Sequence, residues 1–249
     1  MTWTSGQRYL AEFLGTFGLL LSVTGAAVLS LNADQGLVFN ARVMLISFSL
    51  GLGVIGMVYA FGDVSGAHFN PAITIGMWLA GRTKGRDVVP YIVAQVLGGI
   101  LAVGVVAGIA YGSTPLWNSA TSSGVALASQ GYSGNGSPYT VALGSVFLLE
   151  VVLTFFLVFV VLLATREEGF AKNLAPLGIG FTLIMTNLIA IPIDGASVNP
   201  ARSFAPALLT AFSSSTRWAI TQDWLFWVAP IIGGILAAGI ERAFRNRSA

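Results

Sequence analysis

Charged residues make up only 9% of this 249-residue chain, and cysteine is absent. Soluble domains carry about 25% charged residues, so this chain has too few charges to cover a surface that faces water. Without cysteine it has no disulfide, thiolate nucleophile or thiolate metal site. Its one histidine, His68, has no acidic cluster beside it in the sequence, and no nucleophile–base pair is visible. We therefore expect no enzyme, no metal site and no cofactor.

Hydrophobic residues are abundant instead, at 55% of the chain, and the mean hydropathy is +0.80. Most of the long apolar runs reach the ~20 residues with which an α-helix crosses ~30 Å of hydrocarbon. Six runs predict six membrane-spanning helices, at 9–31, 43–61, 88–111, 141–164, 174–193 and 224–238. The first run lacks a clear cleavage site and a basic leader, so it predicts a retained span rather than a signal peptide.

Basic residues fall mostly on one side of the predicted membrane. Nine of the twelve lie at the termini or in alternate connections: Arg8, Arg82, Lys84, Arg86, Arg166, Lys172, Arg242, Arg245 and Arg247. Because positive residues accumulate on the cytoplasmic side, we predict a multi-pass cell-membrane protein with both termini in the cytoplasm. Topology accounts for the basic stretches, so we expect no nucleic-acid partner.

Three sequence landmarks occur twice and in the same order. "AEFLGTF", which contains Glu12, corresponds to "LEVVLTF", which contains Glu150. "GAHFNPA" before the third span corresponds to "GASVNPA" before the sixth. "VAQVLGGILAVG" from Val93 matches "VAPIIGGILAAG" from Val228 at eight of twelve positions. These matches indicate an internal repeat of three spans each.

An odd number of spans per copy makes the second copy enter the membrane from the opposite side, as in an inverted-topology repeat. The sequence therefore predicts an all-α membrane protein with one transmembrane domain over 1–249. Its first repeat is 1–111 and its second is 139–249. The stretch 112–138 is rich in Ser, Gly and Asn and carries no charge, which suits an external linker.

The repeated Asn-Pro-Ala phrases predict two helix starts. Asn is a favoured N-cap, and Pro suits the first helical position. The helices after Asn70 and Asn199 have only about ten to twelve residues, or roughly 15–18 Å, which is half a membrane. By the repeat symmetry they enter from opposite sides and meet near the midplane. Two positive helix ends and two amide side chains there oppose cations and accept a neutral polar solute.

The six spans, the inverted repeat, the paired phrases and the Arg directly after the second phrase together resemble the aquaporin (major intrinsic protein) family over the whole chain. The resemblance implies six transmembrane helices plus two half-helices, and a passive water channel that excludes protons and ions. It also implies a homotetramer with one pore in each protomer. The residues of the phrases that it implies at the pore centre are Asn70, Pro71, Ala72, Asn199, Pro200 and Ala201.

Two further sets of residues follow from the resemblance. The acids Glu12 and Glu150, which lie inside apolar spans, would brace the loops that carry the half-helices, rather than relay protons. Backbone carbonyls before each half-helix would line the lumen as acceptors for water, namely those of Gly66, Ala67, His68, Gly195, Ala196 and Ser197. For the His68 ring, a packed position is as compatible with the sequence as a pore-lining one. Each Asn also has a plain role as a helix cap.

The resemblance places a selectivity filter at Leu50, Asn187, Ala196 and Arg202, counted back from Asn70 and Arg202. Strict water channels have Phe and His at the first two positions, so this filter is atypical and predicted to be wider. Other positions favour the water-channel branch over the glycerol branch: Ser203, Ala207, Phe226 and Trp227. The count along the second span assumes that the helix has no bulge.

The sequence thus predicts a water channel that also passes small neutral solutes such as glycerol and urea. A glycerol or small-polyol facilitator stays open as an alternative. A secondary active transporter stays open as well, because inverted repeats with broken helices also occur in that class. Such a transporter needs an intramembrane coupling acid, and only Glu12 and Glu150 qualify.

Overall fold

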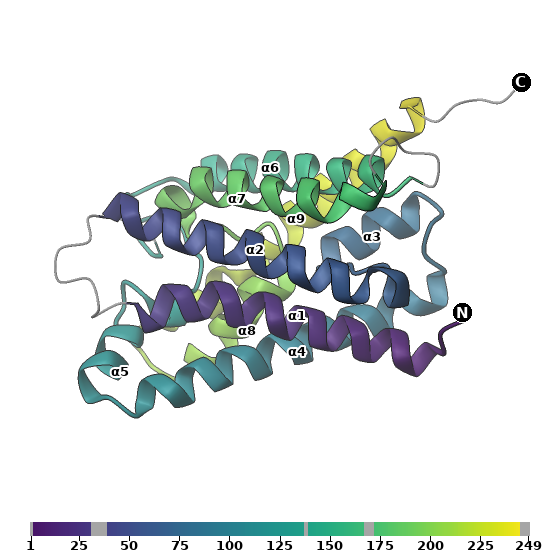
Figure 1. The fold of residues 1–249 in the computed structure, drawn as a ribbon. Helices are drawn as coiled ribbons and strands as arrows, with labels where there is room; N and C mark the ends of the chain where they lie inside the picture. The colour runs from purple at the N-terminus through teal and green to yellow at the C-terminus, as the bar shows by residue number, and fades with distance from the viewer. Residues whose placement is uncertain (1, 31–38, 137–138, 167–171, 245–249) are drawn as a thin grey trace, which may run out of the picture.

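The computed structural model describes residues 2–30, 39–136, 139–166 and 172–244, and every regular element in these ranges is helical. Figure 1 shows the long helices side by side along one direction. Six of them are long and apolar enough to cross a membrane: α1 (Ser5–Leu29), α2 (Phe39–Ser65), α4 (Gly85–Tyr111), α6 (Leu143–Ala164), α7 (Ala175–Asp194) and α9 (Trp218–Glu241). The predicted number of spans and the all-α membrane class are confirmed. Several helices extend beyond their apolar runs, because polar residues continue the same helix.

Two short helices complete the bundle. α3 (Pro71–Leu79) has 9 residues and α8 (Pro200–Thr210) has 11. They lie inside the bundle and approach its middle from opposite ends (Figure 1). Each is too short to span a bilayer by itself, so the structure has the two half-helices that the sequence predicts.

The helix contacts repeat between the two halves of the chain. α1 packs against α2 and α4, and α6 packs against α7 and α9. α2 and α7 join the halves. Each half-helix packs against the last long helix of the other half, α3 against α9 and α8 against α4. The two repeats are therefore interlocked rather than stacked as separate domains.

Glycines allow the closest of these helix contacts. A Cβ on Gly98 of α4 would collide with the backbone of Phe13 in α1. The repeat-related Gly233 of α9 would place a Cβ 2.5 Å from the Val151 carbonyl oxygen in α6. Small residues let membrane helices approach in this way. This packing accounts for the Gly-rich pattern shared by α4 and α9.

The outer surface of the bundle is apolar. On α4, large exposed side chains recur every four residues: Val89, Val93, Leu97, Leu101, Val105 and Ile109. Meanwhile Glu12, Gln95 and Glu150 are fully buried inside. A surface that faces lipid and an interior that holds the polar groups fit a membrane protein.

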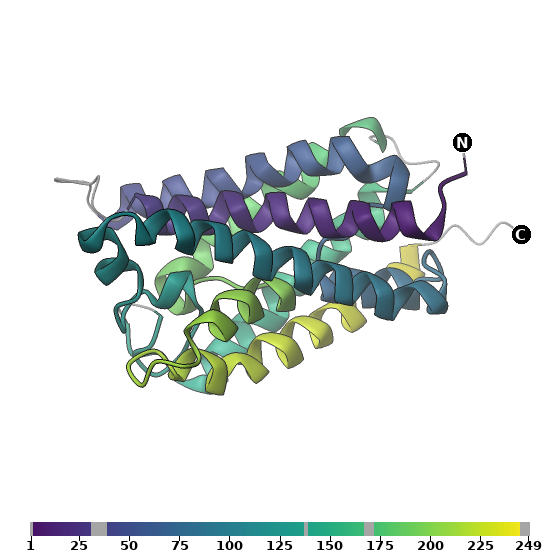
Figure 2. The same ribbon diagram turned by 90° about the horizontal axis from the view of Figure 1, so that it is seen from below.

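The two ends of the bundle differ. α1 begins and α9 ends at the same end of the molecule (Figures 1 and 2). The linker after α4 lies at the other end, and it is more structured than the sequence predicts. It contains α5 (Thr114–Ala120) and the 3₁₀ turn η1 (Ala126–Ala128). Two further 3₁₀ turns are η2 (Lys172–Leu174) and η3 (Arg242–Phe244). Arg245 and Arg247, used in the topology prediction, lie outside the described residues.

Candidate functional site

Two loops of matching conformation lead into the half-helices. Positive φ angles occur at the same three positions of both loops: Gly66 (89°), Ala67 (50°) and Phe69 (50°) in the first, and Gly195 (88°), Ala196 (58°) and Val198 (47°) in the second. Only glycine adopts such angles without steric cost, and other residues lose roughly 1–2 kcal/mol each. The surrounding structure must therefore hold both loops in place.

Glu12 holds the first loop. Its Oε1 accepts hydrogen bonds from the His68 N–H (3.0 Å) and the Ser65 hydroxyl (2.7 Å). Its Oε2 accepts from the Phe69 N–H (2.8 Å) and the Gln95 side-chain amide (2.7 Å). Four donors satisfy this fully buried carboxylate. This is the geometry that loop bracing requires.

Glu150 occupies the equivalent position against the second loop. Its Oε1 accepts from the Ser197 N–H and its Oε2 from the Val198 N–H, both at 2.8 Å. Glu150 is also fully buried. The two acids thus contact backbone N–H groups of the two loops in the same way.

The two Asn side chains join the half-helices at the centre. Asn70 Oδ1 accepts from the Ala72 N–H (2.8 Å) and caps α3, while its Nδ2 donates to the Val198 carbonyl (2.8 Å). Asn199 Oδ1 accepts from the Ala201 N–H (3.0 Å) and caps α8, while its Nδ2 donates to the Phe69 carbonyl (2.9 Å). Each amide therefore ties its own helix to the loop of the other. These bonds use one N–H of each amide, and the second N–H is available to a solute.

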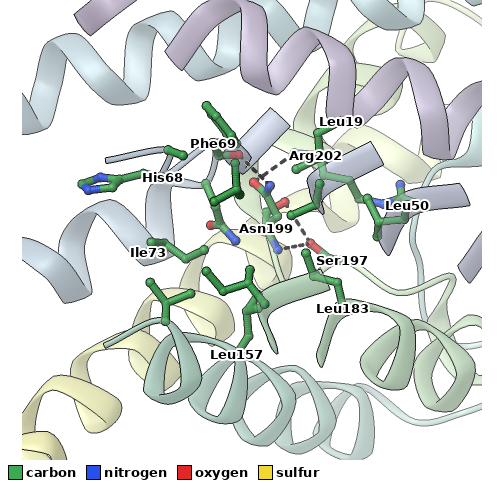
Figure 3. Close-up of a pocket in the computed structure, with 16 residues that line it drawn as sticks. Leu19, Leu50, His68, Phe69, Ile73, Leu157, Leu183, Ser197, Asn199 and Arg202 are labelled. Carbon is green, nitrogen blue, oxygen red and sulfur yellow. Dashed lines mark hydrogen bonds between the residues drawn. The ribbon is translucent and has the colours of Figure 1, made fainter. Parts of the chain in front are cut away.

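A cavity that is partly open to solvent, with about 430 Å³ of empty space, runs past this junction. Figure 3 shows Asn199, Ser197, Leu157 and Leu183 among the residues that line it. Its lining is polar on the loop side and apolar elsewhere: Leu19, Leu50, Val54, Val58, Ala67, His68, Phe69, Asn70, Ile73, Leu157, Val161, Ile179, Leu183, Ser197, Asn199 and Arg202. Predicted site residues from both repeats are therefore brought together around one space.

Most of the apolar wall was not predicted from the sequence, although helical spacing contains a signal for it. Leu50, Val54 and Val58 follow one another at intervals of four on α2, and Ile179 and Leu183 do so on α7. Residues four apart share one face of a helix. Leu19 and Leu157 are also equivalent, since each lies seven residues after the bracing Glu of its repeat. Equivalent leucines of the two repeats therefore both form part of the cavity wall.

Of the residues predicted for the filter and the carbonyl rows, four do not line this cavity: Asn187, Ala196, Gly66 and Gly195. The Pro and Ala residues of the two phrases do not line it either: Pro71, Ala72, Pro200 and Ala201. Asn187 continues the row of Ile179 and Leu183 by one more turn of α7. Its side chain is fully buried, its Nδ2 donates to the Leu183 carbonyl (3.0 Å), and its Oδ1 has no donor among the described residues. The buried amide thus retains an unused acceptor.

Arg202 places a cation at the cavity wall. It is 3% exposed, its Nη1 donates to the Ala128 carbonyl (2.8 Å), and its Nη2 donates to the Gly195 carbonyl (3.3 Å). Its Nε has no acceptor among the described residues. Ile73 holds the equivalent position in the first repeat, three residues after Asn70, and also lines the cavity. Among the residues that line the cavity, the second repeat therefore supplies a fixed charge at a position where the first repeat has an apolar side chain.

His68 both packs and lines the cavity. It is 4% exposed, its Nδ1 lies 3.1 Å from the Thr74 hydroxyl, and its ring meets Tyr91 edge-on at 5.2 Å between centroids. Polar groups on one side of a narrow space and apolar walls on the other can guide a small neutral solute without binding it tightly. This arrangement holds hydrogen-bond donors, acceptors and one cation.

Six spanning helices and two opposed half-helices around a central cavity define an α-helical membrane protein of the inverted-repeat class. Within that class, the chain belongs to the major intrinsic protein family, whose model, described as "Major intrinsic protein", matches residues 1–240. The family assignment made from the repeated phrases is confirmed.

Three relatives named Aquaporin Z match nearly the full chain. The protein from Photorhabdus laumondii is 44% identical over 236 residues, which is 95% of this chain and 96% of that protein. Those from Rhodopseudomonas palustris and Bradyrhizobium diazoefficiens are 42% and 40% identical, each over 95% of this chain and 92% of its own length. The solved structure of the aquaglyceroporin from Plasmodium falciparum has a TM-score of 0.81 at 21% identity and covers 95% of both chains. That likeness supports the fold.

Proposed function

We propose that this protein is a passive transmembrane channel that conducts water and excludes protons and ions. The observation that carries the proposal is the meeting of Asn70 and Asn199, each capping one half-helix and bonded to the loop of the other beside the cavity. Two positive helix ends and the nearby Arg202 oppose a cation there, whereas water can use the free amide N–H groups. The similarity to proteins named Aquaporin Z supports the same function.

Stopped-flow light scattering on proteoliposomes tests this proposal. An osmotic step should shrink vesicles that contain the protein much faster than protein-free vesicles, with a low activation energy for water flux. In planar bilayers the protein should carry no measurable sodium or proton current. A sustained current, or water flux no faster than through lipid alone, would contradict the proposal.

The selectivity filter is the finer part of the proposal: Leu50, Asn187, Ala196 and Arg202 form a relaxed, atypical constriction. Leu50 and Arg202 line the same cavity, and Asn187 continues one of its rows on α7. A wider filter with an apolar wall should admit glycerol or urea beside water. Parallel glycerol and urea gradients in the same vesicles decide between a water channel, a solute-permeable one and a glycerol facilitator.

A secondary transporter would need a coupling acid that faces the solute. The carboxylates of Glu12 and Glu150 are instead occupied by loop donors and do not line the cavity. We therefore expect solute flux that depends only on the solute gradient, with no change when a proton or sodium gradient is imposed.

Four statements about the whole protein belong to the same proposal. The chain forms one domain with repeats at 1–111 and 139–249 and an external linker at 112–138. Both termini face the cytoplasm, in a cell membrane. The protein assembles as a homotetramer with a pore in each protomer. Water, and in addition small neutral solutes, are its ligands.

A further inference from the structure

The two loops before the half-helices differ at one informative position. Ser65 and Asp194 each lie five residues before their Asn and directly before a glycine of positive φ. The Ser65 hydroxyl accepts from the Ala67 N–H (3.1 Å), and Asp194 Oδ1 accepts from the Ala196 N–H (2.8 Å). Each side chain therefore accepts a hydrogen bond from the equivalent N–H group of its own loop. One is a hydroxyl, however, and the other is a carboxyl.

The hydroxyl of Ser65 has a second role, because it donates to Glu12 Oε1 (2.7 Å). Glu12 has a further side-chain donor in Gln95. In the second repeat the residue that matches Gln95 is Pro230, which has no donor. Glu150 therefore has its two backbone N–H donors, and the only repeat-related side chain that can add another is Asp194.

Asp194 and Glu150 bind consecutive N–H groups of the same loop: Asp194 accepts from Ala196, and Glu150 accepts from Ser197 and Val198. The two carboxyl groups therefore lie close together and interact electrostatically. Asp194 is fully buried, and its Oδ2 has no N–H or O–H donor within reach in the described part of the chain. Two ionised carboxylates close together and away from water repel strongly, so such a pair shares one proton. Glu150, which accepts from two N–H groups, is the better place for the negative charge.

We infer that Asp194 is a neutral carboxylic acid whose Oδ2–H donates to Glu150, and that it positions the second loop as the Ser65 hydroxyl positions the first. The proton stays on Asp194 because Glu150 needs a donor at the place where Ser65 donates to Glu12 in the first repeat. Each acidic brace then has a hydroxyl-type donor from the residue before the loop glycine. Asp194 is a positioning residue, since it acts on the loop through Ala196 and Glu150.

This proton also sets the local charge. The charged groups around Asp194 are Glu150 on α6 and Arg202 on α8, and Arg202 interacts electrostatically with both carboxyl groups. The linker backbone beside Gly195, at Ser129 and Gln130, carries no charge. With Asp194 neutral, Glu150 and Arg202 sum to zero. An ionised Asp194 would leave one net negative charge beside the half of the cavity that holds Arg202, which would attract cations.

Infrared spectroscopy of the purified protein in lipid vesicles tests the protonation state directly. A protonated carboxyl absorbs at a C=O stretch separate from that of a carboxylate. The Asp194→Asn variant should lose one such band relative to the unchanged protein. Asp87→Asn is the matched control, because Asp87 is paired with Arg8 at 2.8 Å and should contribute no such band. An unchanged band in Asp194→Asn would overturn the inference, whatever the protein conducts.

The functional consequence rests on the proposed water channel. Asp194→Asn and Asp194→Ser retain a donor for Glu150 and should keep water permeability within about twofold. Asp194→Leu offers neither donor nor acceptor and should lose most of it, or lose thermal stability. If Asp194→Asn were as impaired as Asp194→Leu, the neutral donor role would be wrong. If the unchanged protein passed no water, the proposed function would fail while the infrared result still decided the protonation state.

Discussion

The repeat makes some single residues informative by comparison with their own counterparts. Arg202 and Ile73 hold equivalent positions beside the cavity, but only one is charged. If the charge were needed to hold the half-helix, the first repeat would need one as well. Since Ile73 suffices there, we interpret the cation as serving the solute path.

The variant Arg202→Ile, which copies the first repeat, tests this interpretation. Water flux should persist, while proton or sodium leak should rise because the fixed positive charge is gone. A pH-sensitive dye inside proteoliposomes measures the proton leak. Ile73→Val is the control at the equivalent position and should leave the leak unchanged. An Arg202→Ile protein as proton-tight as the parent would contradict the role of the charge.

The filter residues give a second prediction at this scale. The double change Leu50→Phe with Asn187→His should reduce glycerol or urea permeability and largely preserve water flux, since larger side chains narrow the constriction. Stopped-flow solute uptake, normalised to protein content, measures both. Phe48→Leu is a suitable control, because Phe48 is 44% exposed on the outer face of the same helix. If the parent already excludes both solutes, the relaxed filter is wrong.

At the scale of elements, half-helices are intrinsically weak. Nine or eleven residues are too few for a stable helix in isolation, and both helix starts lie deep in the bundle. Their N-termini are stabilised by Asn caps, by acids behind the loops and by each other's carbonyl groups. These bonds explain how irregular backbone with several positive φ angles persists inside a membrane protein.

Asn70→Ala should therefore weaken more than one element. It removes the α3 cap and leaves the Val198 carbonyl of the opposite loop without its donor. The combined loss should be about 1–3 kcal/mol of folding stability, together with a drop in water flux. Thermal unfolding in detergent and stopped-flow measurements check both. Asn118→Ala is the control, because Asn118 is exposed on α5. Equal effects of the two changes would contradict the cross-linking role.

Close helix packing gives a prediction with an internal control. Gly98→Val should disrupt the α1–α4 contact, since its Cβ would collide with the Phe13 backbone, which cannot yield as a side chain could. Overpacking of this kind costs about 1–3 kcal/mol or more. Gly104→Val lies on the same helix with nothing within 4 Å of its Cβ and should be nearly neutral. Thermal unfolding of both variants measures the difference.

The elements were largely predictable from the sequence, and the wall of the cavity was not. Long apolar runs and duplicated phrases predict spans, half-helices and their symmetry, because membrane thickness and helix capping impose strong local rules. The helical spacing of Val54 and Leu183 groups each with its neighbours on one helix face, but it does not tell whether that face meets lipid or the cavity, because both kinds of position are apolar. Asp194 was missed for a different reason. Its importance depends on its proximity to Glu150, which lies 44 residues earlier in the chain.

At the scale of the whole molecule, the distribution of basic residues predicts one orientation of the protein in the membrane. Two ion-pair clusters lie at the end of the molecule where α1 begins and α9 ends. Arg8 pairs with Asp87 at 2.8 Å, and the buried Glu241 pairs with Arg82 at 3.0 Å and Arg166 at 3.3 Å. These basic residues belong to the set that predicts the cytoplasmic side. The end with α5 should then face outward.

The absence of cysteine makes this orientation directly measurable, because any introduced cysteine is the only thiol in the chain. Gly6→Cys places it near the start of α1, where the backbone is exposed and nothing lies within 4 Å. Asn118→Cys places it on the exposed face of α5, at the opposite end. A membrane-impermeant maleimide applied to intact cells should label Asn118→Cys at once and Gly6→Cys only after lysis. Labelling of Gly6→Cys in intact cells, with Asn118→Cys protected, would reverse the proposed orientation. In that reversed orientation, Arg202 would lie in the cytoplasmic half of the channel instead of the external half.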